Sequence, residues 1–241
     1  MIVNYKEDCW QIISQRAHGL LAGEICFNWK KENRPERWLE TIITTAEHDD
    51  VFDEFDGDNT LLNENGGPVN YKMRPFEQRK CDELLNHATT KSRYIALLIS
   101  RHIRFLYETS DDKAAKTYTA YLKKMEGFWM KEIDVTEEKL SHAYSIVQWC
   151  DAFSLLLCQN LVQPENREIE ISTGPDNISY MLHSPETNKL VVKPWPFEST
   201  AFEITFESRT LKQLRFESVD EFRELLMKTT PNLHHYAICR D

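Results

Sequence analysis

The sequence predicts an α+β protein that is mainly α-helical, with a helical domain over residues 1–163 and a β-rich module over residues 164–241. Helical periodicity dominates up to Gln163 and Pro164, and short segments of alternating apolar and polar residues follow. The chain has 241 residues, 41% of them hydrophobic, which suffices for one large or two small domains with a sizeable core. These observations exclude a disordered or coiled-coil protein.

Local patterns predict each element in turn. The opening residues alternate as two short strands, and these are expected to pair with the later sheet. Predicted helices cover 15–30, Pro35 to about 47, 75–87, 91–108, 111–131 and 136–161. Alternation then predicts strands over 168–172, 178–183, 189–193, 201–206 and 210–216. A capping box at Ser218 begins a last helix, which ends near residue 228 and precedes a strand over 233–239.

Charge, hydropathy and cysteine usage narrow the range of possible functions. The net charge of −10 disfavours binding of nucleic-acid polymers through a broad basic face. No apolar run approaches the roughly 20 residues that span a bilayer, and the N-terminus lacks a signal-peptide pattern. We therefore expect a soluble cytoplasmic protein with no membrane partner. The six cysteines are scattered without a Cys-x-x-Cys pair, which argues against disulfides and a thiolate metal site.

The apolar faces of four predicted helices each carry a histidine or an aspartate. At a period of 3.6 residues, His18 extends the apolar stripe of the first helix, and His48 with Asp49 continues that of the second. His102 and Asp151 lie within the stripes of two later helices. A single such histidine is usually a core residue with a satisfied hydrogen bond, but a buried aspartate is costly unless it is paired or binds a metal.

A shared metal site would account for all of these residues at once. Imidazole nitrogen and carboxylate oxygen suit a divalent ion such as Mn, Fe, Mg, Zn or Co. The alternative is a buried His–Asp hydrogen-bond network without a metal. Nearby residues with a candidate role toward the substrate are Asp50, in an acidic run within a long loop over residues 50–74, and Arg101, beside His102. Arg93 and Lys91 are further candidate phosphate contacts, although exposed surface charge is the usual role of such residues.

The order of these residues resembles the HD-domain superfamily of metal-dependent phosphohydrolases. That pattern is a His, an adjacent His-Asp dyad and a distant Asp, matched here by His18, His48-Asp49 and Asp151. The segment 149–155 resembles the closing helix of the superfamily. His102 matches the additional His of members with two metals, and His87 is a second candidate for that position. The resemblance implies an HD-domain-like helical bundle with His18, His48, Asp49 and Asp151 as metal ligands.

Nearly the whole chain also resembles a bacterial family of domains of unknown function, number three-eight-nine-one. The matching segments are residues 1–3, 18–23, 46–50, 151–158 and 194–197. One departure is Val51-Phe52 after the dyad, where Gly-Trp is expected, so the shape of the pocket beside the metal is expected to differ. Trp195 and Phe197, between prolines in the β part, are expected to pack between the two domains.

The resemblance implies a metal-dependent phosphohydrolase that acts on a small phosphorylated molecule or nucleotide. In that function Asp49 orients the attacking water or bridges two metals, and His102 binds a second metal or the substrate. Two alternatives use the same residues: a di-iron oxygenase-like enzyme, and a non-catalytic module that binds a metal or ligand. The sequence leaves the substrate, the metal and the oligomeric state open.

Overall fold

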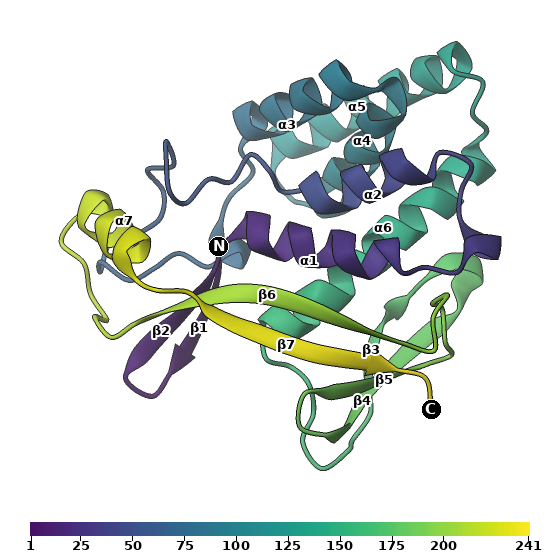
Figure 1. The fold of residues 1–241 in the computed structure, drawn as a ribbon. Helices are drawn as coiled ribbons and strands as arrows, with labels where there is room; N and C mark the ends of the chain where they lie inside the picture. The colour runs from purple at the N-terminus through teal and green to yellow at the C-terminus, as the bar shows by residue number, and fades with distance from the viewer.

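The computed structural model describes residues 1–241 and alternates helices with strands along the chain (Figure 1). The helices are α1 (Gln15–Phe27), α2 (Trp38–Glu47), α3 (Gln78–Lys91), α4 (Arg93–Tyr107), α5 (Lys113–Glu132), α6 (Glu137–Cys158) and α7 (Val219–Lys228). The strands are β1 (Ile2–Lys6), β2 (Cys9–Ile13), β3 (Ile169–Thr173), β4 (Ser179–Glu186), β5 (Lys189–Lys193), β6 (Ala201–Leu211) and β7 (Asn232–Cys239). Short 3-10 helices lie in the connections: η1 (Lys31–Asn33), η2 (Tyr71–Met73) and η3 (Pro175–Asn177).

Side-chain caps explain where most of the helices begin. At each of these starts, a hydroxyl or carboxylate oxygen accepts a hydrogen bond from a backbone N–H of the first turn, which otherwise has no partner. The capping residues of α1, α4, α5, α6 and α7 are Ser14, Ser92, Asp112, Thr136 and Ser218. The predicted helices therefore exist, with ends that differ from the predicted ones by a few residues.

The predicted architecture, a mainly helical HD-type bundle with a separate C-terminal β module, is wrong. Helices hold 47% of the residues and strands 21%, and the strands form one curled, half-barrel sheet of seven strands. The order is β1-β2-β6-β7-β5-β4-β3, and only β5 and β7 pair in parallel. The N-terminal strands are part of this sheet, because β2 pairs with β6 through Ile12 and Arg209. Their predicted pairing with the later strands is thus confirmed.

Pairing between strands that are far apart in the sequence explains why the observed architecture differs from the predicted one. An isolated two-stranded hairpin is at best marginally stable in water, so β1 and β2 need a further strand and a core to cover. Ile2 and Ile13 are fully buried in the same hydrophobic cluster as Ile204 of β6 and Leu21 of α1. The strand β6 also continues without a break where the sequence predicts two strands. Its middle residue Phe206 packs in that cluster too.

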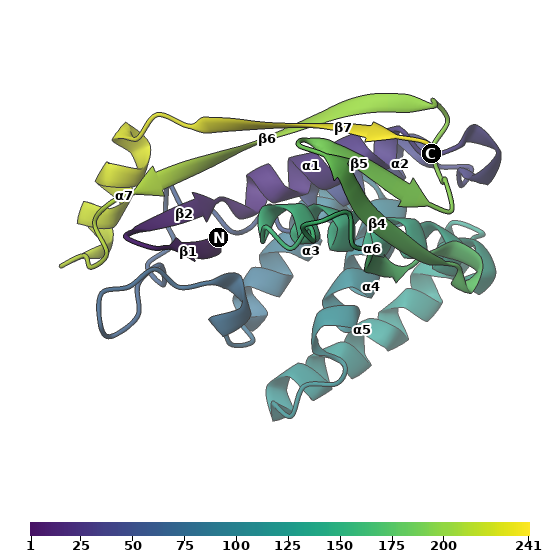
Figure 2. The same cartoon turned by 90° about the horizontal axis from the view of Figure 1, so that it is seen from below.

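The helices lie in layers on one face of the sheet. Helices α1 and α6 lie directly against the strands, α2 and α4 pack on them, and α3 and α5 are farther out (Figures 1 and 2). The largest cluster fills the space between the sheet and the first helical layer, with Trp29, Trp149 and Phe153 completely covered. Phe197 belongs to the same cluster and Trp195 packs against it, so these two residues pack between the sheet and the helices and not between two separate domains. The candidate metal ligands lie on the other side of α1 and α6, toward α2 and α4.

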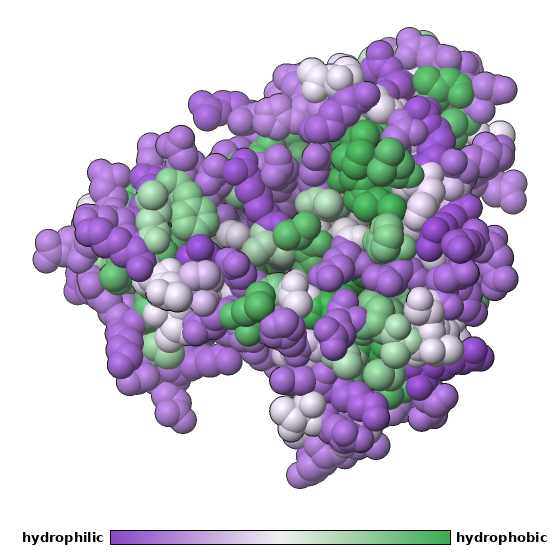
Figure 3. Space-filling model, viewed as in Figure 1, coloured by the Kyte–Doolittle hydropathy of each residue, from purple (hydrophilic) through white to green (hydrophobic).

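The outer surface of the helical layers is mixed in character. No helix combines the length and the apolar composition needed to cross a membrane. Hydrophilic side chains cover most of the face in Figure 3, with separate hydrophobic patches between them. Leu20 and Phe27 of α1 and Leu39 of α2 are more than 60% exposed. Isolated exposed apolar residues of this kind are normal on a protein surface.

Candidate metal centre

Side chains from four helices meet inside the helical layers. His18 comes from α1, His48 and Asp49 from the C-terminal end of α2, Asp151 from α6 and His102 from α4. The three imidazole rings are buried, and the side chains of Asp49 and Asp151 are 13% and 9% exposed. The structure therefore brings together the five residues that the apolar stripes single out.

A close contact between α1 and α2 sets the separation of two of these rings. Gly19 faces Ala46, and a Cβ at Gly19 would lie only 2.5 Å from the carbonyl oxygen of Ala46. Any side chain there would push the two helices apart. The absence of a Cβ lets His18, beside Gly19, approach His48, two residues after Ala46. The rings meet edge to face, with 5.0 Å between their centroids.

Four potential ligand atoms converge on one point. The Nε2 atoms of His18 and His48 are 3.1 Å apart. Asp151 Oδ1 lies 3.1 Å from the first and 3.4 Å from the second. Asp49 Oδ2 lies 3.8 Å and 3.6 Å from the same two nitrogens. These distances suit two imidazoles and two carboxylates arranged around a single small cation.

The hydrogen bonds on the outer ring nitrogens determine which way the lone pairs point. His48 Nδ1 donates to the carbonyl oxygen of Thr45 at 2.8 Å. Ser154 Oγ donates to the Asp151 carbonyl, so it accepts from His18 Nδ1, 2.7 Å away. Each Nδ1 thus carries a proton, and both Nε2 atoms face the centre, where each has a free lone pair when its ring is neutral. Fixing the tautomer of a metal-binding histidine in this way is common in metal sites.

The two aspartates give the centre a strong negative potential. Burial alone would lower the pKa of His48, but the charges of Asp49 and Asp151 outweigh it and raise that pKa from 6.5 to about 9. Burial opposes ionisation of Asp151, yet His48 and His18 hold its pKa well below the usual 3.8. Asp151 Oδ1 has no hydrogen-bond partner although it is buried. The centre therefore requires a cation, either a proton or a metal ion, and its donor atoms fit a metal.

His102 extends the cluster on the side of α4. Its ring meets that of His48 at 4.8 Å between centroids, and its Nδ1 lies 3.4 Å from the Tyr144 hydroxyl. His102, His48 and Asp151 form a second group whose ligand atoms all lie within 4.8 Å of one another. Burial and the neighbouring His48 lower the pKa of His102 to about 4, which keeps its ring neutral and able to bind a metal.

Comparison with protein families identifies the family of this chain. A family model described as "Protein of unknown function (DUF3891)" matches residues 1–213. The chain belongs to this family. No curated protein and no solved structure matches the chain. The family match ends shortly after β6, whereas β7 lies between β6 and β5 in the sheet of this DUF3891 protein. The matched region contains all five residues of the cluster.

A pocket of about 210 Å³ opens beside the candidate metal ligands of this DUF3891 protein. Asp49, Asp151 and His102 form its inner wall. The other lining residues come from α1, α4, α6 and the loop after α2: Gln15, Phe52, Tyr71, Lys72, Arg74, Leu106, Tyr107 and Leu155. Sequence reasoning missed the polar members of this set. The available signals were the long loop that ends in Lys72 and Arg74, and the place of Gln15 one helical turn before His18.

Three residues with predicted roles near the substrate lie elsewhere. Arg101 pairs with Glu126 and Glu137 and does not line this pocket. Asp50 pairs with Arg16 on the surface, 3.1 Å away. His87 is exposed and borders a separate small pocket next to α3. For Arg101 and His87 this follows from helix geometry, because the residue before or after one on a buried face points about 100° away from it, whereas Asp50 lies in the turn after α2.

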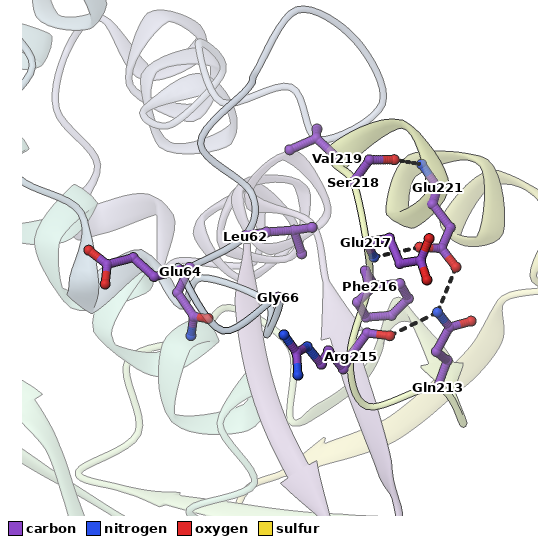
Figure 4. Close-up of a pocket in the computed structure, with 11 residues that line it drawn as sticks. Leu62, Glu64, Gly66, Gln213, Arg215, Phe216, Glu217, Ser218, Val219 and Glu221 are labelled. Atoms are coloured by element: carbon purple, nitrogen blue, oxygen red, sulfur yellow. Dashed lines mark hydrogen bonds between the residues drawn. The ribbon is translucent and has the colours of Figure 1, made fainter.

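A second pocket, of about 600 Å³, lies between the loop after α2 and the segment that joins β6 to α7 (Figure 4). Figure 4 shows Arg215 near Gly66, with Glu217, Glu221 and Gln213 on the other side. Glu221 accepts hydrogen bonds from Gln213 and from the backbone of Glu217. This second pocket contains no histidine, and none of its residues belongs to the His–Asp cluster described above. These contacts cap and anchor α7.

Proposed function

We propose that this DUF3891 protein is a metal-dependent phosphohydrolase that acts on a small phosphorylated molecule. One observation carries the proposal: two imidazole lone pairs and an unpartnered buried carboxylate oxygen face one point on the wall of a pocket. Hydrogen-bond networks that serve only stability pair donors with acceptors. Here acceptors face acceptors once His48 is neutral, which suits a bound metal ion in place of the proton.

His18, His48, Asp49 and Asp151 would hold the ion, an HD-type set of ligands on a different architecture. A divalent metal at such a site lowers the pKa of a water ligand toward neutrality and polarises a phosphoryl oxygen. In hydrolysis the water oxygen bonds to phosphorus, the ester P–O bond breaks, and one proton of the water passes to the leaving oxygen. Asp49, which lines the pocket, would accept a hydrogen bond from that water and orient it.

A second candidate function rests on the second group of ligand atoms. His102 and Asp151 could hold another ion beside the first, whereas the single free nitrogen of His48 can bind only one of the two. Two iron ions in such a pair would suit an oxygenase, with the same side chains as ligands. A binding module without turnover would use the same residues too. The ligand residues are the same for all three functions. The identity of the bound metal therefore distinguishes the functions better than the ligands do.

The test is metal analysis of the purified 241-residue chain, followed by a panel of phosphomonoesters. We expect stoichiometric Mn, Fe, Zn, Mg or Co, and release of inorganic phosphate that stops on chelation and returns on adding metal. Asp49→Asn should abolish release while the circular dichroism spectrum stays unchanged. Iron with visible absorbance and oxygen uptake, but no phosphate release, would favour the oxygenase. Protein that binds no metal would leave only the hydrogen-bond network.

A further inference from the structure

We propose that the pocket beside the metal centre is a subsite for the phosphomonoester of a short hydroxylated compound, with Lys72 binding the phosphoryl group and Gln15 accepting a hydrogen bond from a substrate hydroxyl. This inference rests on the proposed function, because it places the phosphoryl group between Lys72 and the candidate metal ligands. Three features of the pocket carry it: an uncommitted positive charge, an uncommitted acceptor and a small volume.

Lys72 is the uncommitted positive charge. Two cations line the pocket, Lys72 and Arg74. Arg74 is buried and already bound, with Asp58 at 2.6 Å and Glu77 at 2.8 Å. Lys72 is exposed and makes no ion pair, since its polar partner is the neutral amide oxygen of Gln159. An ammonium in this position can bind an anion without breaking an existing salt bridge.

Gln15 is the uncommitted acceptor. Its side-chain Nε2 donates to Asp49 Oδ2 at 2.7 Å. A carboxylate can only accept, so the amide cannot be turned around without losing this bond. The orientation leaves Oε1 buried with no hydrogen-bond partner. Gln15 itself is only 3% exposed and lines the pocket. A buried unpaired acceptor costs free energy, and a substrate hydroxyl would remove that cost.

The volume and the walls limit the rest of the substrate. About 210 Å³ is less than the roughly 300–1,000 Å³ of pockets that enclose drug-sized ligands. A phosphoryl group and a few carbon atoms with hydroxyls fill such a space, and most of a nucleotide would extend beyond it. Phe52, Tyr71 and Tyr107 provide aromatic surface for the carbon chain. The arrangement thus favours a short polyol phosphate over a nucleotide.

Calorimetric titration of the Mn-loaded 241-residue chain tests the subsite with three probes: glycerol 3-phosphate, n-propyl phosphate and AMP. Glycerol 3-phosphate and n-propyl phosphate share the phosphate and the three-carbon chain but differ in hydroxyls. We expect glycerol 3-phosphate to bind about tenfold more tightly than n-propyl phosphate, because only it satisfies Gln15 Oε1. AMP should bind more weakly than either.

Single substitutions show which residue is responsible for each difference in binding. Gln15→Leu should reduce the preference for glycerol 3-phosphate to about one, while n-propyl phosphate still binds and so reports an intact pocket. Lys72→Met should weaken both short probes about tenfold and leave their ratio unchanged. Lys212→Met, at an exposed lysine without an ion pair, is the matched control and should change neither. Metal content is measured for every variant, so that loss of the ion is not mistaken for loss of a contact.

The outcomes separate this inference from the proposed function. Equal affinity of the wild-type chain for both short probes, or a Gln15→Leu variant that keeps the preference, overturns the role of Gln15. Unchanged binding in Lys72→Met overturns the role of Lys72, and tight AMP binding overturns the size limit. If the binding pattern holds but no phosphomonoester is hydrolysed, the proposed function fails and the subsite stands. If esters are hydrolysed without any preference, the proposed function stands and the subsite fails.

Discussion

Two buried charged clusters lie on opposite sides of α4, and their hydrogen bonding differs. One is centred on Glu126 of α5, which is 1% exposed. Its Oε1 accepts from Ser100 at 2.7 Å and its Oε2 from Arg104 at 2.7 Å, with Arg101 2.8 Å away. Both carboxylate oxygens therefore have donors, and each positive charge faces a negative one, although Arg101 Nε and Arg104 Nε are buried donors without a hydrogen-bond partner. This cluster joins α4 to α5 without any need for a ligand.

The other cluster is the His–Asp centre, where acceptors face each other. The outward nitrogens of His18 and His48 are satisfied by the protein, but their inward Nε2 atoms contact only each other and carboxylate oxygens, and Asp151 Oδ1 has no hydrogen-bond partner. The comparison teaches that burial of charge alone does not indicate function. What distinguishes a binding site is an excess of one hydrogen-bonding type, which only a bound ion or molecule can balance.

The largest effect is expected at the complete cluster. Glu126→Gln leaves the buried Arg104 and the partly buried Arg101 without their shared carboxylate, which should lower the free energy of unfolding by about 3–5 kcal/mol. Metal content of the folded fraction should not change. Urea denaturation checks this, with Glu108→Gln as the control because Glu108 also pairs with Arg104 but is 50% exposed. The control should lose no more than about 1 kcal/mol. Equal small losses in both variants would contradict the comparison.

Asp151→Asn should act on the metal and spare the fold. Asn keeps the volume and loses the charge, so metal affinity should fall more than about 100-fold, beyond the usual effect of removing a partner of a ligand. In chelator above pH 9, where His48 has lost its proton, the urea midpoint should stay close to that of wild type, because a costly buried carboxylate has been neutralised. Calorimetry with Mn²⁺ measures the affinity, and Asp50→Asn is the neighbouring control. A collapsed midpoint with unchanged metal content would show a structural network.

Metal binding should compete with a proton on His48. The pKa of His48 in the metal-free protein is raised to about 9, so its stabilising contribution is complete below pH 6.5 and is lost as the pH rises through 9. The stability of the chelated protein should fall over this window, while metal affinity rises by up to tenfold per pH unit. Calorimetry at pH 7.5 in buffers of different ionisation enthalpy should detect about one proton released per metal. No proton release would contradict the assignment.

The smallest effect is expected from the partner of His18. Ser154→Ala removes the acceptor for His18 Nδ1, so the ring loses its fixed orientation and metal affinity should fall about tenfold. The free energy of unfolding should drop by about 1 kcal/mol. Ser141→Ala, on the exposed side of the same helix, is the control and should alter neither quantity. Unchanged metal affinity in Ser154→Ala would mean that the hydroxyl does not orient the ring.

Local patterns were sufficient to predict the helices, most strands and the residues on buried helical faces. Capping residues such as Ser14 and Thr136 act within one turn, so their effect is visible in a short window of sequence. The 3.6-residue period likewise placed His102 and Asp151 on buried faces. Their proximity to His18 was inferred from residue type, and the structure now gives the distances. Whether the cluster is catalytic stays a prediction.

Contacts between distant segments were decided only by the tertiary structure. The sheet takes β1 and β2 from one end of the chain and β7 from the other, because strand pairing depends on which edges the packed core leaves free. The pocket residues Gln15 and Lys72 are 57 positions apart, and neither belongs to a periodic apolar pattern. Periodicity shows which way a side chain faces from its own helix or strand. It does not specify which other segment that side chain will meet, and the chemistry of this site depends on that meeting.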